Sequence, residues 1–363
     1  MTSFSIWWAM RLFVERRKGF AFSSIFHIFL LLIHLLMSKK IITGVKSTGS
    51  SMHLGNLMGA VLPFAQVAKW NDAAIFIADL HSLTSVKDGK TLREQTLEVA
   101  IEYLSIFGVD TPITIFRQSD IHDITKLMWI LTNVAPYSLM LRAHSFKDSE
   151  AKNADINMWV FNYPILMAAD IIGYDCEAVP VGKDQIQHLE MTRDIARAFN
   201  KIYGQEVFIE PEAIIAEEVA TLPGIDGRKM SKSYDNFIGI FDDEKTMKKR
   251  VMSISTGSEW IDEKKKNPDE CNVFNLYKVF ASAEEIAALR TKYESENIGF
   301  GYGHAKTELL NVLLGYLAPY RVTREKLLLD IPFVEAKLAE WARIMNARLE
   351  AKMQVVRELV GVN

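Results

Sequence analysis

The sequence predicts an α/β fold in which a doubly wound parallel sheet is followed by an all-α C-terminal part. Short apolar runs alternate with helical patterns from about residue 41 onward, which is typical of parallel strands joined by crossover helices. A glycine-rich turn follows the first apolar run, at the position where such sheets bind nucleotides. After about residue 240 only helical spacing remains. We therefore expect a Rossmann-like domain followed by a helical one.

Length and composition are those of an ordinary globular protein with two domains. The 363 residues exceed what one core usually spans, since cores stop growing near roughly 250–300 residues. A formal net charge of -3 is too small to indicate nucleic-acid or membrane binding by overall charge. Cys176 and Cys271 stand far apart, outside any CxxC or Cys/His cluster, which argues against structural zinc and against a disulfide framework. This cysteine usage favours a reducing cytoplasm.

An apolar leader precedes the predicted fold. Residues 20–37 form an apolar run broken by two serines and two histidines, with basic residues on both sides. Its length lies at the lower limit for a spanning helix, about 18–20 residues, and histidines disfavour such a span. Three interpretations stay open: a wrongly chosen translation start upstream of Met37, a membrane anchor, or a targeting segment. We expect residues 1–37 to lie outside the fold.

The predicted elements follow in order along the chain. The strands are expected at 41–45, 73–78, 113–116 and 178–181, and the helices at 57–69, 92–107, 165–172 and 185–198. We place a catalytic domain over 38–235 and a helical domain over 236–363, whose final helices could pack back on the catalytic domain. One long amphipathic helix carries a stripe typical of core packing, formed by Val334, Leu338, Trp341, Met345, Leu349, Met353, Val356 and Val360.

Two segments have the chemistry to hold a triphosphate. Residues 44–56 form a glycine-rich turn between strand and helix, which would present backbone N–H groups to an anion. Residues 229–233, Lys-Met-Ser-Lys-Ser, place two lysines three positions apart, where they could neutralise charge as pyrophosphate leaves. Taken singly, the first is equally compatible with a structural turn and the second with a solvated basic loop.

Together, the His-Leu-Gly-Asn string and the Lys-Met-Ser-Lys-Ser string resemble the HIGH and KMSKS signatures of class I aminoacyl-tRNA synthetases. The resemblance covers nearly the whole chain after the leader. It implies ATP as substrate, Mg²⁺ carried by ATP rather than by a protein metal site, and in-line attack of an amino-acid carboxylate on the α-phosphate. It also makes His53, Lys229 and Lys232 catalytic. One extra residue between Gly49 and His53 departs from the family pattern. The ATP contacts implied by the resemblance are Lys46, Ser47, Thr48, Gly55, Asn56, Gly182, Lys183, Asp184, Val219, Lys229, Met230, Ser231, Lys232 and Ser233.

A helical segment indicates which amino acid is activated. Tyr163, Met167 and Asp170 fall at i, i+4 and i+7, on one helix face. A carboxylate in a mostly apolar pocket needs a hydrogen-bond donor, and an indole N–H is such a donor. The alternative is an ordinary helical turn with a surface aspartate. Residues 162–170 resemble the YPxLMAAD signature of the tryptophanyl enzymes, and 179–190 resemble their VPVGxDQxQHxE pattern. The tryptophan contacts implied by that resemblance are Asp170, Tyr163, Met167, Gln185, His81, Val179 and Val181.

The resemblance implies a complete aminoacylation activity. The chain would activate L-tryptophan with ATP to tryptophanyl-adenylate and pyrophosphate, then transfer tryptophan to the 3′ end of tRNA(Trp). It would be a cytoplasmic homodimer, and no membrane association is expected. Basic clusters within 245–250 and at 264–266 are candidate RNA contacts or solvated faces. The alternatives are a tyrosyl-tRNA synthetase, another ATP adenylyltransferase on the same fold, and a membrane-tethered relative that has lost activity.

Overall fold

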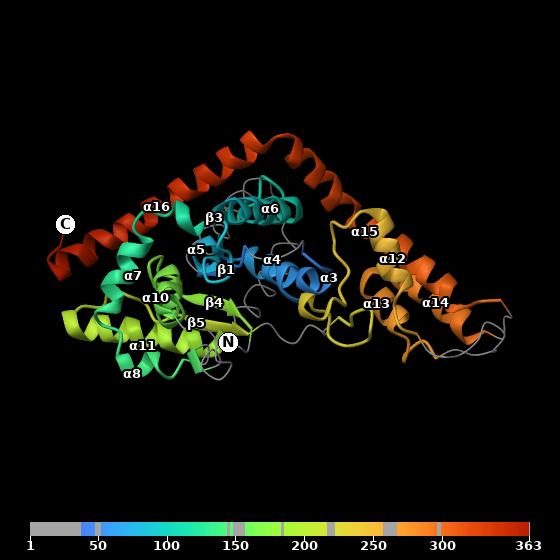
Figure 1. Ribbon diagram of the computed structural model, residues 1–363, viewed down its shortest axis with the longest axis horizontal. Helices are drawn as coiled ribbons and strands as arrows, with labels where there is room; N and C mark the ends of the chain where they lie inside the picture. The colour runs from blue at the N-terminus through green and yellow to red at the C-terminus, as the bar shows by residue number, and fades with distance from the viewer. Residues whose placement is uncertain are drawn as a thin grey trace, which may run out of the picture.

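The computed structural model describes residues 38–47, 52–143, 146–147, 157–182, 185–215, 222–256, 267–295 and 299–362. Within them, parallel strands form one sheet in the order β3-β2-β1-β4-β5 (Figure 1). The chain builds outward from β1 to β3 and then returns to place β4 on the other side of β1, which is the doubly wound order. The predicted fold class is confirmed. The strands are β1 (Lys40–Val45), β2 (Asp72–Ile77), β3 (Thr114–Arg117), β4 (Ala178–Val181) and β5 (Glu212–Ile215).

Strand β5 has no counterpart among the predicted strands, whereas β1 to β4 agree with them to within one residue at each end. The strands differ in their sequence signal because they differ in how far they are buried. Strand β2 has five consecutive buried residues and therefore gives a continuous apolar run. Strand β5 has four residues, follows Pro211 and pairs only with β4 at the edge of the sheet. Such a short edge strand leaves no periodic signal.

Helices flank the sheet and make up the C-terminal half of the chain (Figure 1). The helix predicted from Leu57 begins earlier, as α3 (Leu54–Asn56), and continues through a π-helical stretch, η1 (Leu57–Val61), into α4 (Leu62–Ala68). The remaining helices are α5 (Asp79–Ser82), α6 (Gly89–Phe107), α7 (Ile124–Thr132), α8 (Tyr137–Met140), α10 (Met158–Ile172), α11 (Ile186–Tyr203), α12 (Glu244–Met252), α13 (Asn272–Phe280), α14 (Ala283–Glu294), α15 (Tyr302–Leu329) and α16 (Ile331–Val360), with short 3₁₀ turns η2 (Gln118–Asp120) and η4 (Lys232–Tyr234).

The described side chains pack into two hydrophobic cores. The first core joins the sheet to α6, α7, α10, α11 and α16. The second joins α12 to α15. It also contains Met52, Leu54, Leu57 and Val61, which come from the turn and helix directly after β1. The turn that is expected to hold a triphosphate is therefore built into the helical core as well as the sheet.

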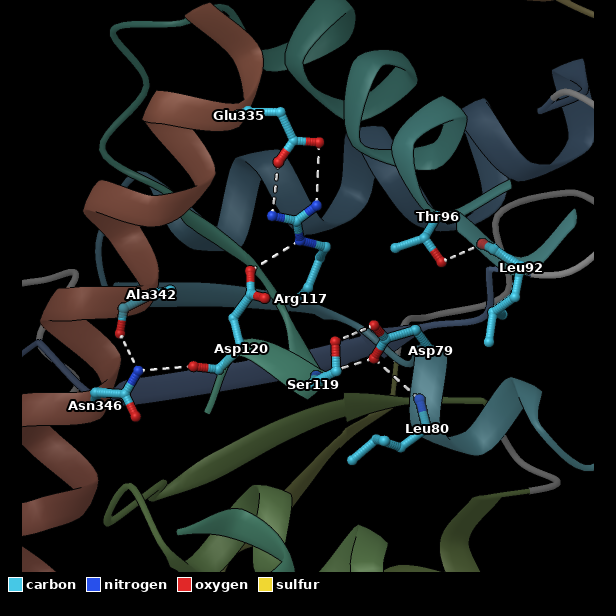
Figure 2. A network of polar contacts seen from close by, with 10 residues as sticks. All are labelled: Asp79, Leu80, Leu92, Thr96, Arg117, Ser119, Asp120, Glu335, Ala342 and Asn346. Atoms are coloured by element: carbon cyan, nitrogen blue, oxygen red, sulfur yellow. Dashed lines mark hydrogen bonds and ion pairs between the residues drawn. The ribbon is translucent and has the colours of Figure 1, made fainter. Parts of the chain in front are cut away.

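Helix α16 returns to the sheet after α15 has crossed the helical region (Figure 1). Seven side chains of the predicted stripe, from Val334 to Val356, are buried in the first core, as core packing predicts. Polar contacts fix the register of this packing (Figure 2). The guanidinium of Arg117 donates to both carboxylate oxygens of Glu335 at 3.1 and 2.7 Å, and to Asp120 at 2.8 Å. The amide of Asn346 donates to the Asp120 carbonyl at 2.8 Å. These contacts join α16 to the end of β3.

In the part of the chain that the structure describes, no helix combines the length and the apolar character needed to cross a membrane. The predicted leader, residues 1–37, lies outside the described residues.

Candidate active site

The signature turn, residues 52–56, lies at the carboxyl end of β1, beside the point where the strand order reverses. Ligands of doubly wound sheets bind at this position. His53 caps helix α3: its Nδ1 accepts the backbone N–H of Asn56 at 3.2 Å, and the Asn56 side chain accepts the His53 N–H at 3.4 Å. This reciprocal pair fixes the imidazole relative to the helix N-terminus. A carbon added at Gly55 would lie 3.0 Å from the His53 ring, so glycine lets the ring take this place.

The histidine of the signature turn is neutral. Burial, and to a smaller extent the positive charge of Lys232, lowers the pKa of His53 to about 4. Because Nδ1 already accepts a hydrogen bond, the single proton of the neutral ring belongs on Nε2. His53 can therefore donate one N–H to a phosphate oxygen without carrying a charge of its own.

The lysine loop, residues 222–236, is organised around Asn236. This side chain is buried, with 1% exposure. Its oxygen accepts the N–H of Ser231 at 2.7 Å, while its amide donates to Asp226 at 2.7 Å and to the Lys229 carbonyl at 3.1 Å. A carbon at Gly224 would come within 2.4 Å of the same amide, so only glycine fits there. One asparagine thus fixes the backbone on both sides of the signature lysines.

Backbone hydrogen bonds join the signature turn to the chain that follows the lysine loop. The N–H of Leu54 donates to the Ile238 carbonyl at 3.0 Å, and the N–H of Ile240 donates to the Met52 carbonyl at 2.9 Å. Met230, the methionine of the signature, is buried in the second core with Leu54. The two signatures are far apart in sequence, yet they form one structural unit.

In this unit Lys232 lies near His53, which is a neutral hydrogen-bond donor. Lys229 is exposed and Lys232 is half-buried. Burial lowers the pKa of Lys232. Lys232 is also near enough to His53 for its charge to act on the imidazole. A lysine and an N–H donor at the carboxyl end of a parallel sheet can bind a phosphate group and stabilise the charge that develops on departing pyrophosphate.

A second group of polar side chains surrounds Asp170, which is 2% exposed. Its Oδ2 accepts the amide of Gln118 at 2.6 Å and lies 3.2 Å from Nε2 of His81. Burial raises the pKa of Asp170, while the hydrogen bonds from His81 and Gln118 oppose that rise. A buried carboxyl supported on one oxygen is suited to accept a further N–H or O–H from a ligand.

The first turns after β2 and β3 position the partners of Asp170. Asp79, at the start of α5, accepts the backbone N–H of Ser119 at 3.0 Å and also its hydroxyl (Figure 2). This contact ties the turn that carries His81 to the turn that carries Gln118. Burial raises the pKa of Asp79 as well. Each of these turns lies at the carboxyl end of its strand, so the parallel sheet brings them together.

Aromatic and apolar side chains complete the surroundings of Asp170. The rings of His81 and Tyr163 meet edge-on at 6.0 Å, and the Tyr163 hydroxyl lies 2.8 Å from Nε2 of His188. Met167 is half-buried on the same helix as Asp170, one turn earlier. Val179 and Val181 point to one side of β4, since they are two residues apart on a strand. The buried carboxyl of Asp170 thus lies in a site with both polar and apolar walls.

The family of the chain follows from its match to a known family model. Residues 38–316 match the model described as tRNA synthetases class I (W and Y). The chain belongs to this family. The synthetase is 43% identical over 325 residues to a tryptophan–tRNA ligase of Fusobacterium nucleatum, covering 89% of the chain and 98% of the relative. The predicted resemblance is confirmed.

Solved structures agree with the family assignment. A crystal structure of tryptophanyl-tRNA synthetase from Campylobacter jejuni, complexed with ADP and tryptophan, aligns with a TM-score of 0.84 at 38% identity. The alignment covers 89% of the chain and 100% of that structure. A curated tryptophan–tRNA ligase of Campylobacter jejuni is 39% identical over 327 residues, with 89% of the chain and 100% of the relative covered.

Ser47, a predicted ATP contact of this synthetase, makes a hydrogen bond within the fold. It is fully buried, and its hydroxyl donates to Ser82 at 2.9 Å. Lys46 is exposed beside it. Gly182 accepts the N–H of Gln185 at 3.0 Å, which turns the chain from β4 into α11. Four predicted ATP contacts lie outside the described residues: Thr48, Lys183, Asp184 and Val219.

The structure adds three polar residues to the synthetase site that are absent from the predicted set: Gln118, Asp79 and His188. Asp79 directly follows a predicted strand and Gln118 directly follows β3, and that position at the carboxyl end of a parallel strand is the signal that could have found them. His188 lies in the first turn of α11 and is the histidine of the VPVGxDQxQHxE pattern, so that resemblance is the signal that could have found it.

Proposed function

We propose that this protein activates L-tryptophan with ATP to form tryptophanyl-adenylate and pyrophosphate, and then transfers tryptophan to the 3′ end of tRNA(Trp). The observation that supports the amino-acid assignment is the buried Asp170, held by Gln118 and His81 on one carboxyl oxygen. An indole N–H would donate to this carboxyl while the indole rings fill the apolar space. Tyr163, Met167, Gln185, Val179 and Val181 are the proposed walls of this pocket.

The activation step needs positioning and charge stabilisation rather than a protein nucleophile. A carboxylate oxygen of tryptophan attacks the α-phosphorus, and the bond from that phosphorus to the oxygen bridging toward the β-phosphate breaks. Pyrophosphate leaves with that oxygen, and its added charge meets Lys229, Lys232 and the Nε2–H of His53. Mg²⁺ accompanies the triphosphate and neutralises part of its charge. Lys46, Gly55, Asn56 and Gly182 are proposed to hold the rest of ATP.

The proposal is tested by ATP–pyrophosphate exchange with the purified full chain and each of the twenty amino acids. We expect exchange with tryptophan alone. Asp170→Ala should abolish it, whereas Asp194→Ala, an exposed aspartate on α11, should leave it unchanged. Exchange with tyrosine would replace the substrate assignment, because a phenol O–H can also donate to Asp170. Absence of exchange with any amino acid would support an inactive relative.

Tyrosine is the second candidate substrate because the matching family model covers both tryptophan and tyrosine enzymes. Met167 and the valines of β4 favour tryptophan, since they offer apolar contacts to a large ring system and no partner for a second polar group. The relatives named tryptophan–tRNA ligase at 39% identity or more also support tryptophan.

The assignment of a separate function to each domain is also a proposal. We infer that residues 38–235 form the catalytic domain and that residues 236–363 form the helical domain that binds the tRNA anticodon, with α16 packed back on the catalytic domain. A cleft of about 490 Å³ between α13, α14 and α15 supports this, because the part-exposed aromatic side chain of Tyr316 lines it over the buried Tyr277 and Phe280. Flat aromatic side chains stack well on unpaired RNA bases.

If the helical domain binds the anticodon, a change there should affect tRNA charging but not ATP–pyrophosphate exchange. Tyr316→Ala should lower tRNA charging and leave ATP–pyrophosphate exchange unchanged, because the cleft lies in the second core, away from Asp170. Phe333→Ala removes an exposed aromatic of α16 and serves as the control. Equal charging by both variants would place the anticodon elsewhere.

A cytoplasmic homodimer is the proposed assembly. Trp129, Tyr137 and Met158 are 72%, 70% and 69% exposed on α7, α8 and α10, and α10 packs against both other helices. Large exposed apolar side chains on neighbouring helices support a subunit interface. Light scattering should give a dimer for the protein and a monomer for Trp129→Glu. Leu329→Glu, a change at the 89% exposed last residue of α15, should stay dimeric.

A further inference from the structure

The side chain of Gln118 depends on the turn that carries it. Gln118 is fully buried, and its amide donates to Oδ2 of Asp170 at 2.6 Å. Within the described part of the chain, its other polar atom, Oε1, has no hydrogen-bond partner. A glutamine side chain has several torsions, and one hydrogen bond does not fix them all. The support that Gln118 gives to Asp170 therefore requires that η2, the turn that begins at Gln118, is itself held in place.

Two side chains hold the backbone of η2, and Figure 2 shows them on either side of it. Asp79 of α5 accepts the backbone N–H of Ser119 at 3.0 Å. Asn346 of α16 contacts the next part of the turn: its amide donates to the Asp120 carbonyl at 2.8 Å, and its oxygen accepts the backbone N–H of His122 at 2.9 Å. One side chain of α16 thus pairs with the backbone at the end of η2 and again two residues later.

Asn346 is itself fixed on α16. Its side chain is half-buried, and its amide also donates to the Ala342 carbonyl, one turn earlier on the same helix, at 3.0 Å. Both N–H groups of the amide and its oxygen are therefore engaged. The apolar face of α16 lies in the first core, so the helix cannot shift easily. Asn346 is thus a rigid support for the turn and not a mobile surface side chain.

A second contact from α16 acts on the same turn. Glu335 binds the guanidinium of Arg117 through both carboxylate oxygens, at 3.1 and 2.7 Å. The Nε of Arg117 donates to the Asp120 carboxylate at 2.8 Å. Arg117 directly precedes η2 and Asp120 ends it, so Gln118 lies between two positions that α16 holds.

We propose that Asn346 is a positioning residue for the amino-acid pocket: it holds η2, η2 directs Gln118, and Gln118 fixes the Asp170 carboxyl that accepts the indole N–H. The proposal rests on the proposed function, because it takes Asp170 as the acceptor of the substrate N–H. Its consequence is that the last helix of the chain, which does not touch the substrate, sets how well tryptophan is distinguished from an analogue without that donor.

The first variant is Asn346→Ala, which removes the hydrogen bonds to Asp120 and His122. In ATP–pyrophosphate exchange we expect KM for tryptophan to rise by about three- to thirtyfold, the range for losing the hydrogen bonds of one partly buried side chain. KM for ATP should stay within about twofold of the wild type. A loss of folded protein alone would lower the apparent kcat and leave both KM values unchanged, and that result would overturn the proposal.

An analogue of tryptophan tests whether the effect passes through Asp170. The benzothiophene analogue has sulfur in place of the indole N–H, so it cannot donate to that carboxyl. Its inhibition constant in ATP–pyrophosphate exchange should be the same for Asn346→Ala and the wild type, because the lost support acts on a hydrogen bond that this analogue does not make. An inhibition constant that rises as much as KM for tryptophan would mean that the whole pocket is distorted, and would overturn the proposal.

Two further variants isolate the contact with η2. Asn346→Asp keeps the volume and an oxygen for the His122 N–H, but as a carboxylate it cannot donate to the Asp120 carbonyl, so KM for tryptophan should rise as well. Arg348→Ala is the matched control, because Arg348 joins α16 to Asp72 at the start of β2, at the other end of the sheet, with a 2.9 Å ion pair. It should keep the wild-type KM. A wild-type KM in Asn346→Asp, or an equal rise in Arg348→Ala, would contradict the proposed role.

Hydrogen–deuterium exchange at the Ser119 N–H separates failure of this proposal from failure of the proposed function, because it needs no substrate. The acceptor of this N–H, Asp79, is untouched in Asn346→Ala, so faster hydrogen exchange there means that the whole turn is loosened. Faster exchange supports the positioning role even if no amino acid supports the reaction, and an unchanged rate overturns it. If the enzyme uses tyrosine, the rise should appear in KM for tyrosine, since a phenol O–H would donate to the same carboxyl.

Discussion

Replacing Asn236 with alanine removes the side chain that organises the lysine loop. Asn236 is buried and makes hydrogen bonds to Ser231, Asp226 and Lys229. At roughly 1 kcal/mol for each of these bonds, the ordered loop loses about 3 kcal/mol relative to open conformations. That loss corresponds to about a hundredfold shift in the equilibrium between ordered and open loops. We therefore expect kcat/KM for ATP to fall by about ten- to hundredfold, with KM for tryptophan close to the wild type.

ATP–pyrophosphate exchange measured against both substrates checks this prediction. Asn275→Ala is the matched control, because its amide donates to a single backbone carbonyl, that of Asp269, away from the lysine loop. Far-ultraviolet circular dichroism should be the same for both variants, since the affected bonds lie in a loop. If folded Asn236→Ala kept kcat/KM for ATP within about threefold of the wild type, the loop would not depend on this side chain, and the reasoning would fail.

Three further predictions concern the two polar groups of the site. Gly55→Ala places a carbon 3.0 Å from the His53 ring and 3.4 Å from Met230, and should lower kcat/KM for ATP about ten- to hundredfold. Gly59→Ala, which meets open space, should have no effect, and equal losses would refute the steric argument. Because the folded pKa of His53 is about 4, below its ordinary 6.5, protonation disfavours the folded state. Stability should decline as pH falls from about 6.5 toward 4, and this part of the decline should vanish in His53→Asn, as Tm measurements across this range would show. Burial raises the pKa of Asp170, so its ionisation favours unfolding as pH rises above the ordinary value. Asp170→Asn should therefore raise Tm at neutral pH while abolishing exchange, and the gain should disappear in acid; a lower Tm at neutral pH would contradict this.

The sheet and its central turn could be predicted because their signals are local. A strand that is buried on both faces is a continuous apolar run, and a phosphate-binding turn needs glycine directly after such a run. The stripe from Val334 to Val360 likewise predicts a helix with one buried face. It does not predict what covers that face, because amphipathicity records burial and not the partner. The sequence allows the final helices to pack back on the catalytic domain, but the contact of α16 with β3 itself is visible only in the structure.

The site was predictable where residues act in a string and unpredictable where they meet across the fold. His53 and Lys232 belong to recognisable strings, whereas the pairing of residues 52–54 with 238–240 joins segments with no shared local pattern. Gln118 is one ordinary residue after a strand, and only the parallel sheet brings it to Asp170. Ser47 is the opposite case. Its position suggests an ATP contact, but its hydroxyl donates a hydrogen bond to Ser82.

Helix α16 also constrains how the protein can be made. It covers β3, and a carbon at Gly173 would meet both Leu127 of α7 and Leu349 of α16, so these helices are in close contact. Translation produces the sheet first and α16 after every element that it covers. The nascent sheet therefore leaves the ribosome with an apolar flank uncovered, and chaperones have a defined surface to protect until synthesis is finished. A chain that stops before residue 331 would keep that flank exposed and be degraded rather than persist as a half-active enzyme.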